Sequence, residues 1–231
     1  MSLLSVVRDV CAVVGVAMPQ SVFSSLPTNR TMQEMLALAN EMAQRIAYDT
    51  RDWTKLKQTQ VFAGDGIQTV FPMPADFHRM LLSSNVWYSQ WTQAPLSFIS
   101  DTDEWIVRRA RGANSSFGEW TMLGDGMHIH GPPAAGASVY FAYLGKNCIN
   151  LASGGRSDSF VADGDTFVLS ERLLKLGMIW QWKAQKGAPY AEDMGTYGDA
   201  LTYAMGHDQP APVIIDRKVA GSGAMPNAYI F

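Results

Sequence analysis

The sequence predicts an α+β fold in which an α-helical bundle carries an inserted antiparallel β module and an extended C-terminal tail. Three observations lead to this prediction. Apolar residues recur at helical spacing towards both ends of the chain, short strand-like segments separated by turn residues fill the middle, and the last stretch is rich in proline and glycine. The predicted boundaries place the bundle at 1–53 and 167–207, the β module at 54–146, a loop at 147–166 and the tail at 208–231.

The N-terminal part predicts two helices. Residues 3–16 carry leucines and valines on one helical face, and Gly15 and Pro19 end this helix before a polar loop. The second helix begins at Thr31, which together with Glu34 has the spacing of a capping box. Its buried face is predicted to contain Met32, Met35, Leu36, Ala39, Met42, Ala43 and Ile46.

After Trp53 the pattern changes to that of short strands. The candidate strands are 55–62, 67–71, 80–88, 96–99, 105–109, 119–123, 127–130 and 138–144. Two Gly-Asp-Gly segments, at 64–66 and 124–126, lie between candidate strands and predict hairpin turns of the type I′ kind that Asp-Gly favours. Pro72 and Pro74 end the second strand, because proline cannot donate a ladder hydrogen bond.

Helical spacing resumes at 167–186, and a further helix is predicted to open at Pro189 and to stop at Gly206. Its apolar face would contain Tyr190, Met194, Tyr197, Leu201 and Met205. The tail that follows contains two apolar segments, at 213–215 and 229–231.

Composition narrows the function classes. The formal net charge of -3 argues against a protein that binds duplex DNA non-specifically through a basic surface. Only 17% of the residues are charged, while seven Trp, eight Tyr, ten Phe and thirteen Met favour a subunit interface. Cys11 and Cys148 lack CxxC spacing and are predicted to be free and buried.

No membrane segment is expected. Arg8 and Asp9 interrupt the apolar N-terminal run, which argues against a secretory signal peptide. The apolar stretch at 173–182 is too short to span a bilayer and contains Lys175. We therefore expect a soluble protein made in the cytoplasm.

Candidate metal ligands are few. The residues around Asp65 and Asp125 lack the oxygen ligands of a calcium loop. Asp163-Gly164-Asp165, with Ser157, Asp158 and Ser159 nearby, is a better candidate, but a turn and helix-capping role is favoured. His128 and His130 share one face of a strand and could form half of a zinc site, without an evident third ligand. We expect no metal and no cofactor.

Candidate catalytic residues are equally isolated. Asp101, Asp103, Glu104 and Glu119 could supply the carboxylate pair of a glycosidase, but no sequence feature marks one of them as a buried acid. Arg108, Arg109 and Arg111 beside Trp105 could contact nucleic acid, although a solvated face or an ion-pair role is favoured. The nucleotide-binding and hydrolase fingerprints are absent from the sequence, so we expect that the protein is not an enzyme.

Several segments together resemble one family. They are TRDW at 50–53, VFPMPADFHRM at 70–80, GDGMHIHGPPAAGASVYFAYLGKN at 124–147 and DTFVLSERLLKLGMIWQWKAQKG at 165–187. This order resembles the adaptor proteins of tailed bacteriophages, the head–tail connectors that dock under the portal. The resemblance covers roughly residues 25–205 and leaves 89–118 without a match.

The resemblance implies a virion protein at the head–tail interface that forms a ring, usually dodecameric, under the portal protein. The ring completes the channel through which double-stranded DNA passes without sequence recognition, and it is followed by a downstream tail or nozzle protein. A net negative charge suits a channel in which DNA must slide.

The predicted partner-binding residues lie in the tail, which would add a strand to a portal subunit or pack in its crevice. They are Val213, Ile214, Ile215, Arg217, Lys218, Tyr229, Ile230 and Phe231. Two alternatives remain open at this point: a tail-associated cell-wall hydrolase, and a tail module that binds a glycan or receptor through residues 54–146.

Overall fold

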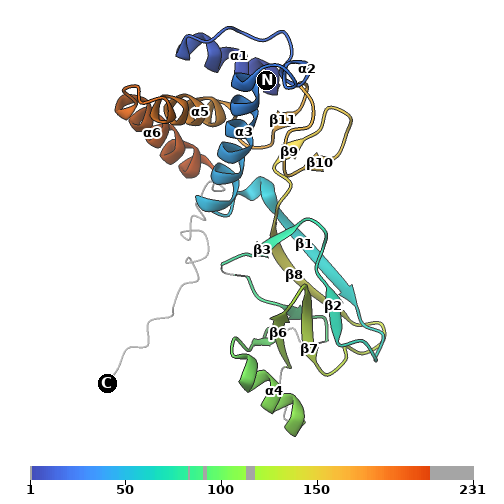
Figure 1. The fold of residues 1–231 in the computed structure, drawn as a ribbon. Helices are drawn as coiled ribbons and strands as arrows, with labels where there is room; N and C mark the ends of the chain where they lie inside the picture. Colours follow the sequence, from blue (N-terminus) through green and yellow to red (C-terminus); the bar gives the residue numbers. More distant parts are fainter. Residues whose placement is uncertain (1, 83, 91–92, 113–117, 209–231) are drawn as a thin grey trace, which may run out of the picture.

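The structure is a computed structural model that describes residues 2–82, 84–90, 93–112 and 118–208. It contains both helices and sheets, which confirms the predicted mixed α+β class. Figure 1 shows an elongated molecule with most helices at one end, the larger sheets at the other, and helix α4 beyond the sheets.

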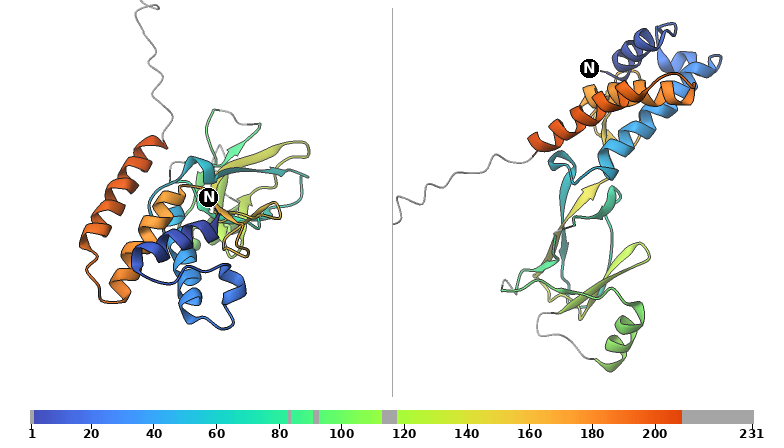
Figure 2. Two further views of the ribbon diagram at one scale, coloured as in Figure 1. Left: turned by 90° about the horizontal axis from the view of Figure 1, so that it is seen from above. Right: turned by 90° about the vertical axis from the view of Figure 1, so that its left-hand side faces the viewer.

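Four longer helices form the helical end. They are α1 (Leu3–Val14), α3 (Arg30–Gln44), α5 (Glu171–Gln185) and α6 (Ala191–His207). α5 packs against α1, α3 and α6, so segments from the two ends of the chain share one buried apolar cluster. This cluster contains both cysteines, which are free and buried as predicted. α6 is the outermost helix of this end (Figure 2).

The start of α3 differs from the prediction. The capping residue is Asn29, whose side-chain oxygen accepts from the backbone N–H groups of Thr31 and Met32 at 3.0 and 3.3 Å. The capping box at Thr31 and Glu34 is therefore wrong, and Glu34 instead accepts from Lys186 at 2.6 Å. Asparagine is as good a cap as threonine, and here it lies two residues earlier. The loop before α3 also contains a short helix, α2 (Val22–Ser25).

The strands form two four-stranded sheets and one small sheet. In the first, β1 (Lys57–Ala63) and β3 (Phe77–Met80) flank β8 (Ser138–Gly145), which also pairs with β4 (Trp87–Tyr88). The second has the order β2 (Val70–Pro72), β7 (Gly126–His130), β6 (Glu119–Leu123) and β5 (Ser97–Phe98). Their shared cluster of buried residues includes Phe62, Phe71, Met127 and Phe141.

The two Gly-Asp-Gly segments prove to differ. The second is a hairpin turn between β6 and β7, with a positive φ at Gly124 only, which fits a type II′ rather than a type I′ turn. The first does not close a hairpin, because β1 pairs with β8 and β2 pairs with β7. It links the two sheets, and Asp65 stabilises it by accepting from the backbone N–H groups of Ile67 and Gln68.

Residues 105–109 are helical, so the predicted strand is wrong. They belong to α4 (Thr102–Arg111), which begins after the capping residue Asp101 and ends at Gly112 in the left-handed conformation. Only Trp105 of this helix is buried. Acidic residues in the first turn and basic residues in the last turn interact favourably with the helix dipole. This stabilises the helix although its apolar residues favour a strand.

Smaller differences concern the C-terminal half. The predicted loop 147–166 contains most of a small sheet, in which β9 (Ile149–Asn150) pairs with β10 (Arg156–Ser157) and with β11 (Thr166–Phe167). α6 begins at Ala191, after Pro189, and continues through Gly206 to His207.

Candidate interaction surfaces

The partner-binding residues predicted in the tail lie outside the described residues. They are Val213, Ile214, Ile215, Arg217, Lys218, Tyr229, Ile230 and Phe231. The structure does describe the residue directly before this segment, Asp208, which follows directly on α6.

Asp208 is held at the junction between the helices and the sheets. Its Oδ2 accepts from the Thr54 backbone N–H at 2.9 Å and lies 3.7 Å from the Arg51 guanidinium, while its carbonyl accepts from the Thr54 hydroxyl at 2.9 Å. Arg51 also donates to the Met205 carbonyl at the end of α6. These contacts hold Asp208, the base of the tail, against the chain segment that leads into β1.

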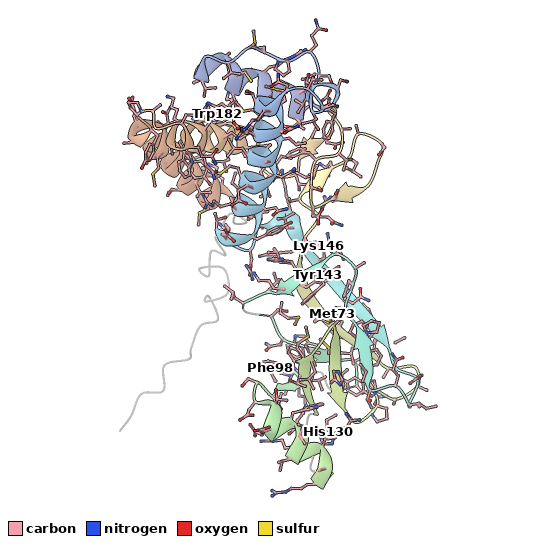
Figure 3. The ribbon with its side chains drawn as sticks, in the orientation of Figure 1. Met73, Phe98, His130, Tyr143, Lys146 and Trp182 are labelled. Carbon is pink, nitrogen blue, oxygen red and sulfur yellow. The ribbon has the colours of Figure 1, made fainter. Side chains whose placement is uncertain are left out.

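The junction itself is held by aromatic and charged contacts. The Tyr48 ring stacks on His78 with centroids 4.3 Å apart, and its hydroxyl donates to the Lys146 carbonyl. Arg79 and Asp52 form an ion pair at 2.5 Å across the same region. Desolvation, followed by the charge of Arg79, lowers the pKa of His78. Figure 3 shows Lys146 and Tyr143 where the two ends of the molecule meet.

The apolar face predicted for α6 is covered only in part. Tyr197 is its only buried side chain, and Leu201 and Met205 are partly buried against α5 and its neighbours. Met194, from the predicted apolar face, is 50% exposed, and Tyr203 is 65% exposed. The predicted face is therefore only partly covered within this chain.

Two glycines add to this open surface. Gly195 and Gly198 lie within α6, and a Cβ atom built on either would meet no atom within 4 Å. Glycine inside a helix is less stable than alanine by roughly 0.5–1 kcal/mol. Contacts among the described residues therefore do not explain why these two positions are glycine.

The acidic and basic residues near α4 attach this helix to the sheet. Glu119 on β6 is fully buried, and its carboxylate contacts Arg108 at 2.5 Å and the His130 Nδ1 at 3.3 Å. Arg108 also pairs with Glu104 at 2.6 Å, and these two carboxylates raise the pKa of its guanidinium. Asp101 caps the helix. Of the four carboxylates considered for a glycosidase, Asp101 therefore serves as a cap and Glu104 and Glu119 as ion-pair partners, while Asp103 lies in the acidic first turn of α4.

Asp163 and Asp165 act in local structure, as favoured from the sequence. Asp163 accepts from the first backbone N–H groups of α2, Val22 and Phe23, at 3.0 and 3.3 Å. The buried Asp165 carboxylate accepts from the N–H groups of Ala152, Val161 and Ala162. Within the described ranges, no three His, Cys, Asp or Glu side chains are grouped closely enough to hold a metal ion.

One pocket of about 170 Å³ lies beside β7 and is lined mainly by apolar residues, among them Leu96, Ile129, Pro132 and Pro133. His130 is its main titratable side chain, and that imidazole already contacts the buried Glu119. The volume suits a single side chain rather than a cofactor.

Two comparisons with known proteins found no relative of this chain. No family model matches this chain, and no curated protein matches its sequence. In the described part of the chain, every helix is too short or too polar to cross a lipid bilayer.

Proposed function

We propose that this chain is a structural adaptor of a tailed-bacteriophage head–tail connector, a non-enzymatic virion protein that forms a ring under the portal and completes the DNA channel. The portal protein, a downstream tail or nozzle protein and further copies of the chain are its proposed partners. The proposed organisation is a helical bundle from 1–53 and 167–207, an inserted β module at 54–146 and an extended tail from 208 onwards.

The uncovered face of α6 is the observation that carries this proposal. A monomer gains nothing from exposing Met194 beside two helix-weakening glycines, whereas a subunit whose neighbour packs on α6 does. Small residues at such a face allow two backbones to approach closely, and a ring repeats the contact at every subunit. The sequence resemblance to adaptor proteins supports the same assignment.

The anchored base of the tail supports the second part of the proposal. Asp208 is fixed by Thr54 and Arg51, so each subunit of a ring would release its tail at the same position. The tail would add a strand to a portal subunit or fill a crevice on it, and a ring would multiply a weak contact.

Deleting residues 209–231 tests the proposal and keeps Asp208 in place. The shortened chain is expected to fold with an unchanged unfolding free energy and to lose binding to portal-bearing capsids. As a matched control, Ser222→Ala in the full chain changes one tail residue outside the predicted contact set and is expected to leave docking unchanged. Normal docking by the shortened chain would contradict the proposed role of the tail.

A further inference from the structure

α4 and the adjoining sheet line a shallow, open hollow at the end of the molecule away from the main helices. Its volume is about 340 Å³, and it is lined by Trp105, Ile106, Arg109, Ala110, Leu123 and His128. Ile106 is 56% exposed. Figure 1 shows α4 at this end, and Figure 3 places Phe98 and His130 close to it.

Two polar side chains of the hollow have no partner among the described residues. The Arg109 guanidinium is exposed and forms no ion pair or hydrogen bond with them, in contrast to that of Arg108 at the preceding position of the helix. His128 has a buried Nδ1 without a hydrogen-bond partner in the described part of the chain. An unpaired buried polar atom destabilises a fold, so a bound group that donates to it or accepts from it would be favoured.

The platform around the hollow is firmly attached. Trp105 is only 2% exposed and meets the His130 ring edge-on at 5.9 Å. The Arg108–Glu119 pair joins the helix to β6, and both helix ends are capped. A partner would therefore meet a preformed surface and would not have to order it first.

We infer that this hollow binds an acidic peptide segment of a partner protein. An apolar side chain of the segment packs on Ile106 and Leu123, and a neighbouring carboxylate pairs with Arg109. Arginine and carboxylate match in geometry and charge, and an apolar anchor beside such a pair is typical of protein interfaces. The binding is independent of the connector role, because none of the lining residues belongs to α6 or the tail.

Nucleic acid fits the hollow less well. Of the three arginines of α4, Arg108 is paired with two carboxylates and Arg111 does not line the hollow, so Arg109 supplies the one guanidinium there that has no partner among the described residues. Affinity for phosphates rises with the number of cations that contact them, and the exposed apolar Ile106 contributes nothing to it.

The test is a selection of random peptides displayed on particles against the purified full chain. The expected peptides carry Asp or Glu next to a large apolar residue. Their affinity is expected to fall about tenfold or more for Arg109→Glu, a loss typical of a charge-assisted pair, and to fall also for Ile106→Ser. Arg109→Lys keeps the charge and is expected to retain part of the binding.

The matched control is Lys57→Glu, which makes the same change of charge at an exposed residue of β1 and should leave binding unchanged. Thermal unfolding of each variant shows whether the fold is kept. Three results would overturn the inference: selection of no peptide, selection of peptides without acidic residues, or equal binding by Arg109→Glu. Tighter binding of a duplex DNA probe, lost in Arg109→Glu, would overturn it as well.

Discussion

Replacing the two glycines of α6 by alanine separates the stability of the single chain from its assembly. Neither Gly195 nor Gly198 has a positive φ, and the added methyl groups would meet no atom within 4 Å. The folded chain can therefore accept both alanines without strain. A neighbouring subunit packed on this face would have no room for them.

The expected size follows from helix propensity. Each Gly→Ala change inside a helix stabilises the folded state by roughly 0.5–1 kcal/mol, so the double variant should gain about 1–2 kcal/mol. For a chain of this length the melting temperature would rise by about 2–8 °C. Urea unfolding of the chain at a concentration where it is monomeric measures the gain, and portal-dependent ring assembly is measured on the same samples.

Gly177→Ala is the contrasting control. It lies in α5, where a Cβ would fall 2.4 Å from the Cε of the buried Met42, so it should lose stability through overpacking. If Gly195→Ala/Gly198→Ala destabilises the monomer, the α6 face is not open. If the variant is stabilised yet still assembles normally, the glycines do not mark a subunit contact.

Three further predictions concern the helical end and the junction. Desolvation lowers the pKa of His78 in the folded chain. As the pH drops through 6.5, the ordinary pKa of histidine, the unfolded chain therefore binds a proton more readily than the folded chain, and the free energy of unfolding should fall. Urea unfolding at about pH 7.5 and about pH 5.5 should show a smaller fall for His78→Phe than for the wild type, and an equal fall would refute the assignment. Burial also raises the pKa of the Cys11 and Cys148 thiols, so a thiol reagent should label them only after unfolding, and rapid labelling of the native protein would show that they are accessible. Asp208→Ala removes the acceptor for the Thr54 N–H and should lower the unfolding free energy by about 1 kcal/mol, with faster amide exchange in the last turn of α6; unchanged exchange would show that the tail base is not fixed there.

The helices at both ends of the chain could be predicted because their signals are local. Met32, Met35, Ala39 and Met42 recur at helical spacing, and all four are buried in α3. The hairpin around Gly124 was predicted for the same reason, since both of its strands adjoin the turn.

Long-range pairing could not be predicted in this way. β1 pairs with β8, so that Phe62 lies opposite Val139, and no local pattern around the first Gly-Asp-Gly segment distinguishes this pairing from a hairpin. The helix α4 was missed although Asp101 and Gly112 carried its start and stop signals, because Trp105 and the apolar residues after it favour a strand.

The candidate surfaces were only partly predictable. An apolar helical face in a sequence does not show which of its residues the chain itself will bury: in α6, Tyr197 is buried and Met194 is exposed. The sequence also could not show that Arg108 forms an ion pair with Glu119 while the Arg109 side chain has no partner among the described residues. That difference depends on the position of Glu119 on β6, outside the helix.

The central claim is that this chain is a subunit that assembles with further copies of itself and with a portal protein. The mass of the purified full chain, determined by light scattering alone and after mixing with a portal protein from the same source, tests this most directly. We expect a complex of the portal with a ring of several copies of the chain, and loss of that complex for the chain shortened after Asp208. A mass for the mixture that equals the sum of unbound components would contradict the claim.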